Sequence, residues 1–284
     1  MIQLAIRNLK IFFRDKSAVF FSLLAVFIII GLYVLFLGDM FEKEMSQIED
    51  ARFLMDSWIM AGLLGITSIT TTMGAFGIMV NDKYRKISKD FYTAPIRKST
   101  LAGGYIISTF VIGVIMCIIT LVLAEIYIVS SGGKILPVLA IIKIFGLILI
   151  SVISSSSMVF FAVSFFNSQN AFASACTVIG TLIGFLTGIY IPIGSLPNAV
   201  QIIVKIFPVS HSAALFRQVF MEYPLSQAFH NAPVEKLNEF KESFGVIFKF
   251  GDHIISPAAS IAVLILTTAV FYSLAIINLS RKKK

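Results

Sequence analysis

Charged residues are scarce in this sequence: Asp, Glu, Lys and Arg together make up 13% of its 284 residues. In soluble globular proteins about a quarter of the residues are charged. Here, by contrast, 57% of the residues are hydrophobic and the mean hydropathy is +0.92. A chain of this composition cannot cover its surface with polar side chains. The composition therefore excludes a soluble globule and predicts an integral membrane protein.

Motifs for catalysis and nucleotide binding are also absent from the sequence. The phosphate-binding pattern G-x-x-x-x-G-K-[ST] does not occur, because the glycines before Lys134 lack its spacing. His211, His230 and His253 lack the H-x-x-x-H spacing of a helical zinc site. We expect no enzymatic activity, no metal and no bound cofactor in this chain. If the chain moves a solute uphill, the energy must come from elsewhere.

Several apolar runs are long enough to cross a membrane, since about 20 helical residues span the roughly 30 Å hydrocarbon core. The runs cover residues 17–37, 57–80, 101–129, 137–166, 171–191 and 257–279. They predict an all-α integral membrane protein with six transmembrane helices, folded as a single transmembrane domain over residues 1–284.

Basic residues gather on one side of these spans. Fourteen of the 23 Lys and Arg lie in residues 1–16, 81–100 and 281–284, beside three acidic residues. The segments on the other side hold nine basic and eleven acidic residues. The positive-inside rule therefore predicts that both termini are cytoplasmic. The basic residues form short clusters beside apolar runs, a pattern of membrane topology rather than of nucleic-acid binding.

Residues 1–16 have the pattern of an amphipathic helix. Four apolar residues fall on one helical face and three cations on the opposite face. The two sets are Ile2, Ile6, Leu9 and Phe13, and Arg7, Lys10 and Arg14. We expect an interfacial helix lying flat in the headgroups, with its cations facing anionic lipid or a partner. The alternative is a plain positively charged flank to the first span.

Residues 81–100 form a basic segment between the second and third spans. Read as a helix from Asp82 to Tyr92, it places Tyr84, Ile87 and Phe91 on one face. Pro95 would end this helix, because proline lacks an N–H group. A charged amphipathic helix at the cytoplasmic surface is expected to contact a partner.

Residues 192–256 form the largest segment outside the predicted spans. Its first half is too apolar for a solvated loop, and Pro192, Pro197 and Pro208 break it too often for a span. An apolar re-entrant helical hairpin in the outer leaflet fits this pattern. The remainder, from residue 221, is amphipathic and is expected to cap the outer face.

Small and hydroxyl residues mark two of the spans. Gly180, Gly184 and Gly188 form a stripe in the fifth span, which suits either packing within the chain or a homodimer seam. Thr67 and Thr71 belong to a hydroxyl-rich stretch of the second span. Such hydroxyls ordinarily bond to carbonyls of their own helix, and the alternative is that they line a cavity.

Three segments together resemble a known family. The first is the start of the chain, residues 4–16. The second reads FYTAPIR at 91–97 and LAGG at 101–104. The third reads GIYIP at 188–192 and SLP at 195–197, followed by FPV at 207–209 and LFR at 215–217. They resemble, in this order, the interfacial helix, the coupling loop and the re-entrant segment of the membrane subunit of bacterial ABC-2 type transporters.

The resemblance implies a half-transporter that exports a hydrophobic or amphiphilic substrate (a drug, peptide or lipid) across the bacterial inner (plasma) membrane. Two copies, or this chain and a paralogue, would pair within membrane lipid and bind two separately encoded ABC ATPase subunits, which hold ATP and Mg²⁺. The implied contacts with the ATPase are Lys83, Tyr84, Arg85, Ile87, Phe91, Pro95 and Arg97. The implied translocation pathway and outer gate contain Thr67, Thr71, Gly184, Gly188, Pro192 and Pro197. Residues 82–86, which precede the coupling-loop sequence, are richer in lysine and arginine than is usual in the family.

Two alternatives remain at this stage. An ion-coupled secondary transporter would need buried titratable residues on repeated broken helices, and the sequence has almost none. A polysaccharide-exporting ABC permease would share the same architecture and differ in its substrate.

Overall fold

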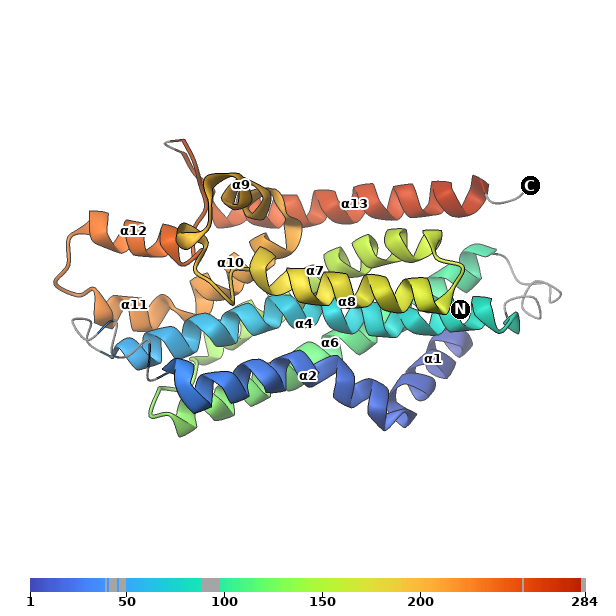
Figure 1. Cartoon of the computed structure of the whole chain (residues 1–284), viewed down its shortest axis with the longest axis horizontal. Coiled ribbons are helices and arrows are strands. Elements are labelled where there is room, and N and C mark those ends of the chain that lie inside the picture. The colour runs from blue at the N-terminus through green and yellow to red at the C-terminus, as the bar shows by residue number, and fades with distance from the viewer. Residues whose placement is uncertain (39, 41–44, 46–49, 88–97, 252, 282–284) are drawn as a thin grey trace.

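The computed structural model describes residues 1–38, 40, 45, 50–87, 98–251 and 253–281 (Figure 1). The first half contains α1 (Ile2–Arg14), α2 (Lys16–Leu32), the π-helical segment η1 (Tyr33–Leu37), α4 (Ala51–Tyr84) and α6 (Lys98–Ser130). Next come α7 (Val138–Phe165), α8 (Gln169–Leu186), the 3₁₀ turn η2 (Ile193–Ser195), α9 (Asn198–Ile206) and α10 (Pro208–Phe220). The last elements are α11 (Glu222–Ala228), α12 (Val234–Ser243), the strands β1 (Lys249–Phe250) and β2 (His253–Ile254), and α13 (Pro257–Arg281).

The six predicted membrane spans are confirmed. The helices long and apolar enough to cross a membrane are Lys16–Leu35, Ala51–Tyr84, Ser99–Ser130, Val138–Phe165, Gln169–Leu186 and Pro257–Asn278. The start of α1 and the end of α13 lie at the same end of the bundle, which we call the terminal end (Figure 1). The opposite end, which carries α11 and α12, is called the distal end.

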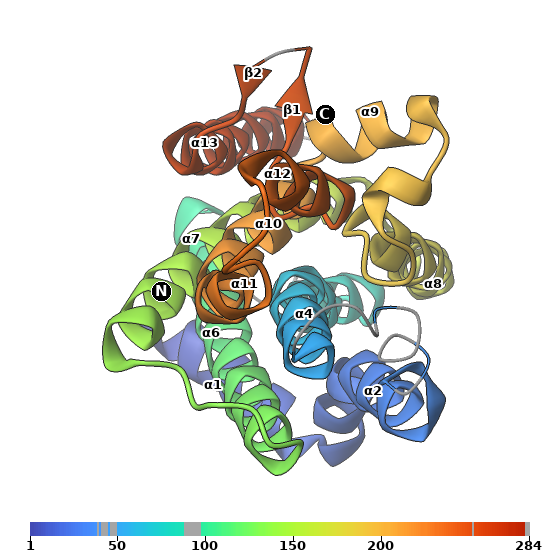
Figure 2. The ribbon, with the colours of Figure 1, turned by 90° about the vertical axis from the view of Figure 1, so that its left-hand side faces the viewer.

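The helix α4 is the centre of the bundle. It has 34 residues and runs from the distal end to the terminal end, with α2, α6, α8 and α10 around it (Figure 2). In its most apolar stretch 78% of the residues are buried, against 17% for α8 and for α13. The outer helices therefore expose apolar side chains that lipid can cover, whereas α4 is covered by protein.

The break between α1 and α2 follows from Asp15. Its carboxylate accepts a hydrogen bond from the backbone N–H of Ala18 at 3.0 Å and so caps the N-terminus of α2. The predicted amphipathic helix at the start of the chain is thereby separated from the first span. Ile2, Ile6 and Phe13 are exposed on α1, as expected for side chains that meet lipid.

The predicted re-entrant hairpin corresponds to α9 and α10, which meet at an angle of 84°. Phe207 has an extended backbone between them and Pro208 occupies the first turn of α10. Proline disfavours helical geometry in the residue before it and suits the first turn of a helix, so the chain bends at this point. The predicted distal cap is formed by α11, α12 and the two-stranded β1–β2 hairpin.

The prediction of a separate helix beginning at Asp82 is wrong. Residues 82–84 are the last turn of α4, which continues without a break from Ala51. The helix ends at Tyr84 with Arg85 as its C-cap, and Lys86 has a positive φ of 62°. The side chain of Asp82 is buried against α1 and α6, which keeps this turn in the bundle. The remainder of the predicted helix, from residue 88, lies outside the described residues.

Candidate functional site

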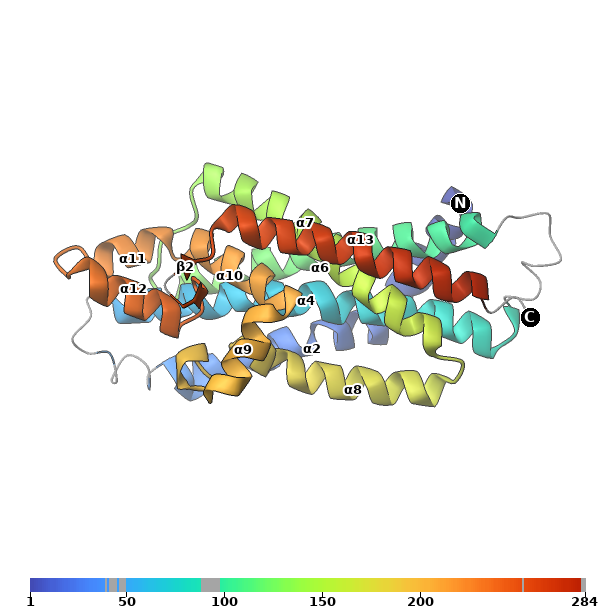
Figure 3. The same cartoon turned by 90° about the horizontal axis from the view of Figure 1, so that it is seen from above.

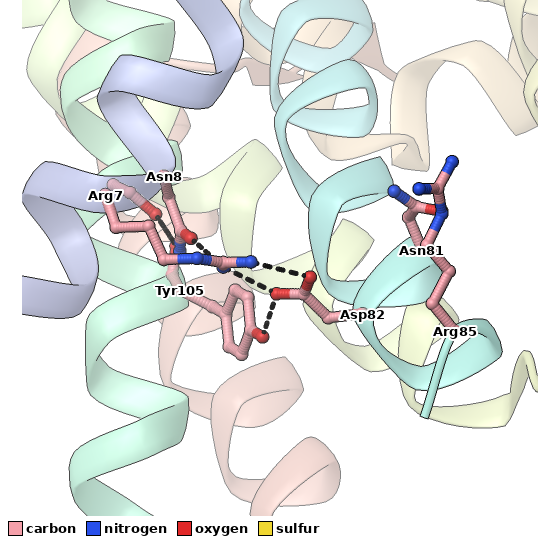
Figure 4. A network of polar contacts seen from close by, with 7 residues as sticks. Arg7, Asn8, Asn81, Asp82, Arg85 and Tyr105 are labelled. Carbon is pink, nitrogen blue, oxygen red and sulfur yellow. Dashed lines mark hydrogen bonds and ion pairs between the residues drawn. The ribbon is translucent and has the colours of Figure 1, made fainter. Parts of the chain in front are cut away.

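A buried carboxylate joins three helices at the terminal end of the bundle (Figure 4). Asp82, at the end of α4, accepts hydrogen bonds from Nη1 and Nη2 of Arg7 on α1, at 2.7 and 3.0 Å. The hydroxyl of Tyr105 on α6 donates to the same carboxylate at 2.6 Å. The side chain of Asp82 is 2% exposed. We call Arg7, Asp82 and Tyr105 the Asp82 junction.

The geometry of the Asp82 junction is that of a strong, directional contact. Two parallel N–H···O bonds between a guanidinium and a carboxylate fix the distance and the orientation of both groups. The hydrogen bond to Asp82 raises the pKa of Arg7, so the guanidinium remains charged. A buried carboxylate without such partners would be costly. The junction therefore ties α1, α4 and α6 together at this end.

Close packing of α1 on α6 supports the same junction. Asn8 donates from Nδ2 to the hydroxyl of Ser108 at 3.2 Å, and both side chains are buried. A Cβ atom on Gly104 would lie 2.7 Å from Cδ2 of Leu4, and one on Gly103 would lie 2.7 Å from Sδ of Met1. The two glycines therefore allow the backbone of α6 to approach α1. The LAGG sequence is explained in part by this contact.

An exposed, partly basic surface lies beside the Asp82 junction. A hollow of about 540 Å³ runs along α1, and its described lining includes Ile6, Lys10 and Arg14. Tyr84, two residues after the buried Asp82, is 61% exposed. An exposed aromatic side chain next to cations is typical of a docking surface for another protein. We call the exposed residues Lys10 and Arg14 of α1, together with Tyr84 and Arg85 at the end of α4, the terminal surface.

The structure brings part of the predicted ATPase-contact set to this surface. Lys83, Tyr84 and Arg85 end α4 and its cap, and Ile87 follows the turn. Arg85 donates from Nε to the side-chain carbonyl of Asn81 at 3.1 Å. Three members of the set, Phe91, Pro95 and Arg97, lie outside the described residues. Arg7 differs from Lys10 and Arg14, since its guanidinium turns toward α4 rather than outward.

Thr67 and Thr71 lie inside the bundle. Both side chains are fully buried, and each donates a hydrogen bond to the carbonyl four residues earlier, at 2.7 and 2.6 Å. The hydroxyl of Thr120 on α6 donates to the Thr67 hydroxyl at 3.3 Å. These contacts support a role in packing α4 against α6. Both side chains are covered by the described part of the bundle.

Gly184, Gly188, Pro192 and Pro197 lie near the distal end of α8. A Cβ on Gly184 would lie 2.1 Å from the ring of Tyr190, so the ring folds back over this glycine. Gly188 has φ +66° and permits the turn that ends α8. Pro192 and Pro197 precede η2 and α9. Gly180 faces open space and is therefore not explained by packing within the chain.

A wholly apolar groove lies between α8 and the rest of the bundle. It has a volume of about 270 Å³, and its lining contains Met73 of α4, Phe161 of α7, Ala175 of α8 and Phe271 of α13. Figure 3 shows α8 along one edge of the molecule. A groove at this depth in an apolar bundle suits a hydrocarbon or aromatic group.

Some functional candidates were not identified from the sequence. In the sequence, Asp82 is the first residue of an expected helix in a basic segment, and Tyr105 is one residue of an apolar span. Arg217 belongs to the LFR motif, and nothing in the sequence indicates that its side chain is fully buried. A useful signal is the position of Asp82 itself, an acid two residues after the 24-residue apolar run at 57–80. Within the described residues no group of three or more His, Cys, Asp or Glu side chains is arranged to hold a metal ion.

These features define a multi-pass α-helical membrane protein with a central span joined to an amphipathic terminal helix. The sequence model described as ABC-2 family transporter protein matches residues 50–277. The chain therefore belongs to the ABC-2 family of transporter proteins, as the resemblance indicated. Membership implies partnership with an ABC ATPase subunit. A search among curated proteins finds no match.

Proposed function

We propose that this chain is the permease subunit of an ATP-driven exporter, and that a separate ABC ATPase subunit docks on the terminal surface. The terminal end would face the cytoplasm, in the inner (plasma) membrane of a bacterial cell. The basic residues of residues 1–16 and 81–100 support this orientation. The chain would work as a pair, with a second copy or a paralogue, and ATP and Mg²⁺ would bind only to the ATPase.

The Asp82 junction is the observation that carries the proposal. It fixes the amphipathic helix α1 to the end of α4, directly beside the exposed Tyr84. A force applied to the terminal surface is thus transmitted to a 34-residue helix that reaches the distal end. An ATPase that changes shape against this surface would shift α4 relative to its neighbours. Such rigid elements are the ordinary carriers of coupling between distant sites.

The proposed pathway passes along α4 and α8 to a gate at the distal end. Gly184, Gly188, Pro192 and Pro197 surround the turn that connects α8 to the re-entrant hairpin, and we assign them to this gate. The burial of Thr67 and Thr71 supports packing of α4 as their role in the closed chain. The pathway would reach them only when α4 and α6 separate.

The apolar groove beside α8 supports a hydrophobic or amphiphilic substrate, such as a drug, a peptide or a lipid. Its described lining is apolar over about 270 Å³. A long polysaccharide would require hydroxyl-binding groups, which this groove does not offer. The preference for an amphiphile rests on this chemistry.

Reconstitution tests the proposed function. The chain would be co-expressed with an ABC ATPase encoded beside it, and inside-out vesicles would be supplied with a fluorescent amphiphile and ATP. Accumulation that requires both subunits and hydrolysable ATP is the expected result. Accumulation driven by a proton or sodium gradient without the ATPase would instead support an ion-coupled transporter.

A further inference from the structure

The side chain of Arg217 on α10 is a buried cation without an acidic partner among the described residues. It is 0% exposed, and the ion pairs of the described residues do not include it. Its Nη2 donates to the backbone carbonyl of Gly188 at 3.2 Å. Its Nε and Nη1 have no hydrogen-bond partner in the described part of the chain. The guanidinium is therefore held by a carbonyl just beyond the end of α8, where helix carbonyls carry partial negative charge.

Trp58, the single tryptophan of the chain, forms the second contact of this guanidinium. The guanidinium carbon lies 4.9 Å from the centre of the Trp58 ring, within the range of a cation–π contact. The indole Nε1 donates to the carbonyl of Phe244 at 2.7 Å. Arg217 and Trp58 together connect α10, α4 and the chain that follows α12.

Glycines make the space that the guanidinium occupies. A Cβ on Gly62 of α4 would lie 3.2 Å from Nη2, and a Cβ on Gly245 would lie 3.0 Å from Nη1. Gly245 has φ +65°, and Gly188 has φ +66°. Three separate segments thus bring a glycine to one guanidinium. The arrangement fits this side chain closely.

We propose that Arg217 is the positioning residue of the distal gate, holding the end of α8 against α4 and the distal cap while the gate is closed. Its contacts cross the boundary that must open for a substrate to leave between α4 and α8. This inference rests on the proposed export function for the purpose of the gate, although the contacts themselves do not depend on it.

The incomplete hydrogen bonding of the Arg217 guanidinium suits a contact that must break in each transport cycle. Among the described residues this buried cation contacts a carbonyl and an aromatic ring, and two of its donor nitrogens, Nε and Nη1, lose water without gaining an acceptor, which is costly. Opening would return water to these donors and so offset the lost contacts. A complete ion pair would hold the two helices more firmly and make opening harder. Arg217 therefore keeps the gate closed without locking it.

Cysteine labelling in the resting state tests this role separately from transport. The background would be the full chain in membranes with Cys117→Ala and Cys176→Ala. Ile189→Cys would then report the gate, because Ile189 is 4% exposed and its Cδ1 would lie 3.1 Å from a Cβ on Gly62. A membrane-impermeant maleimide would be added from the distal side without ATP.

Arg217→Gln is expected to speed labelling of Ile189→Cys by about tenfold or more, because the local opening becomes more frequent. Arg217→Lys, which keeps the charge but loses the planar fork, should give an intermediate rate. Lys143→Gln is the matched control, since Lys143 is a half-exposed distal cation paired with Glu222 at 3.6 Å. It should leave the rate unchanged. Equal rates for Arg217→Gln and its parent would overturn the proposal.

A second reporter distinguishes gate opening from general loosening of the fold. Ala124→Cys on α6 is the reporter, because Ala124 is 0% exposed in the distal part of that helix. Its labelling should not change with Arg217→Gln, and an equal increase at both reporters would contradict the proposed role. If Arg217→Gln does not reach the membrane, Trp58→Phe replaces it, and unchanged Ile189→Cys labelling in that variant also counts against the proposal. Failure of ATP-driven transport would affect only the proposed function.

Discussion

The guanidinium of Arg7 binds both carboxylate oxygens of Asp82, at 2.7 and 3.0 Å, across 75 positions of sequence. This pair joins the amphipathic helix α1 to the central helix α4. It lies at the end of the bundle where the basic residues of the sequence gather, beside the exposed Tyr84. The relationship gives a physical route from a docked partner to the interior of the membrane domain.

Replacing Asp82 with Asn should lower the stability of the fold by weakening the contact with Arg7. The variant keeps the size of the side chain but removes the charge that Arg7 binds, and we expect a loss of about 1–3 kcal/mol in the free energy of unfolding. Unfolding in mixed micelles measures this loss. In a double-mutant cycle with Arg7→Gln, a coupling energy above about 0.5 kcal/mol is expected. A cycle without coupling would show that the pair makes no net contribution.

Replacing Tyr84 with Asp should weaken binding of the ATPase and leave the stability of the fold nearly unchanged. Tyr84 is 61% exposed, so the change in stability should stay within about 0.5 kcal/mol, as is usual for surface substitutions. An added negative charge and the loss of the ring should nonetheless reduce co-purification of the ATPase. Tyr223→Asp at the distal end is the matched control and should bind the ATPase normally. Unchanged co-purification with Tyr84→Asp would contradict docking at this residue.

Replacing Gly104 with Ala should push α1 away from α6. The new Cβ would lie 2.7 Å from Cδ2 and 3.0 Å from Cβ of Leu4, and overpacking of this kind costs about 1–3 kcal/mol. Thermal unfolding of the purified protein checks the effect. Adding Leu4→Ala should restore part of the stability, because it removes Cγ and Cδ2 of Leu4 and leaves only the Cβ contact. Gly146→Ala is a control, since its Cβ would meet nothing within 4 Å. A melting temperature for Gly104→Ala equal to that of the parent would argue against the close approach.

There is a physical reason why some features of the fold could be predicted from the sequence and others could not. Spans such as residues 257–279 can be recognised in the sequence because a helix that crosses the membrane needs about 20 apolar residues in one run. The hairpin of α9 and α10 can be recognised because Pro208 disfavours helical geometry at Phe207. Both signals are local, so they appear within a short window of sequence.

The features that were not predicted depend on distant partners. Asp82 looks like a loop charge until Arg7 and Tyr105 are seen around it, and neither is near it in sequence. The buried state of Arg217 depends on glycines at 62 and 245, which no periodic pattern connects to it. The helix expected from Asp82 onward was wrong for the same reason, because tertiary contacts kept its first turn in α4.

Filling the apolar groove should impair export of bulky amphiphiles. Ala175→Trp would place a large ring in a groove of about 270 Å³, while Val178→Trp on the same helix would point to the exposed side. Transport by Ala175→Trp should fall several-fold with ATP hydrolysis retained, since the change lies away from the terminal surface. Vesicle uptake measured beside ATPase activity gives both quantities. Equal transport by the two variants would show that the groove does not hold the substrate.

Site-directed cross-linking tests the central claim most directly. Cysteines would be introduced singly at Lys10, Tyr84 and Tyr223 in a background without Cys117 and Cys176, and a photoreactive thiol reagent would be attached in the presence of the ATPase. The account predicts cross-links to the ATPase from positions 10 and 84 that change with bound nucleotide, and none from position 223. Absence of cross-links from positions 10 and 84, in a complex that still hydrolyses ATP and transports, would contradict it.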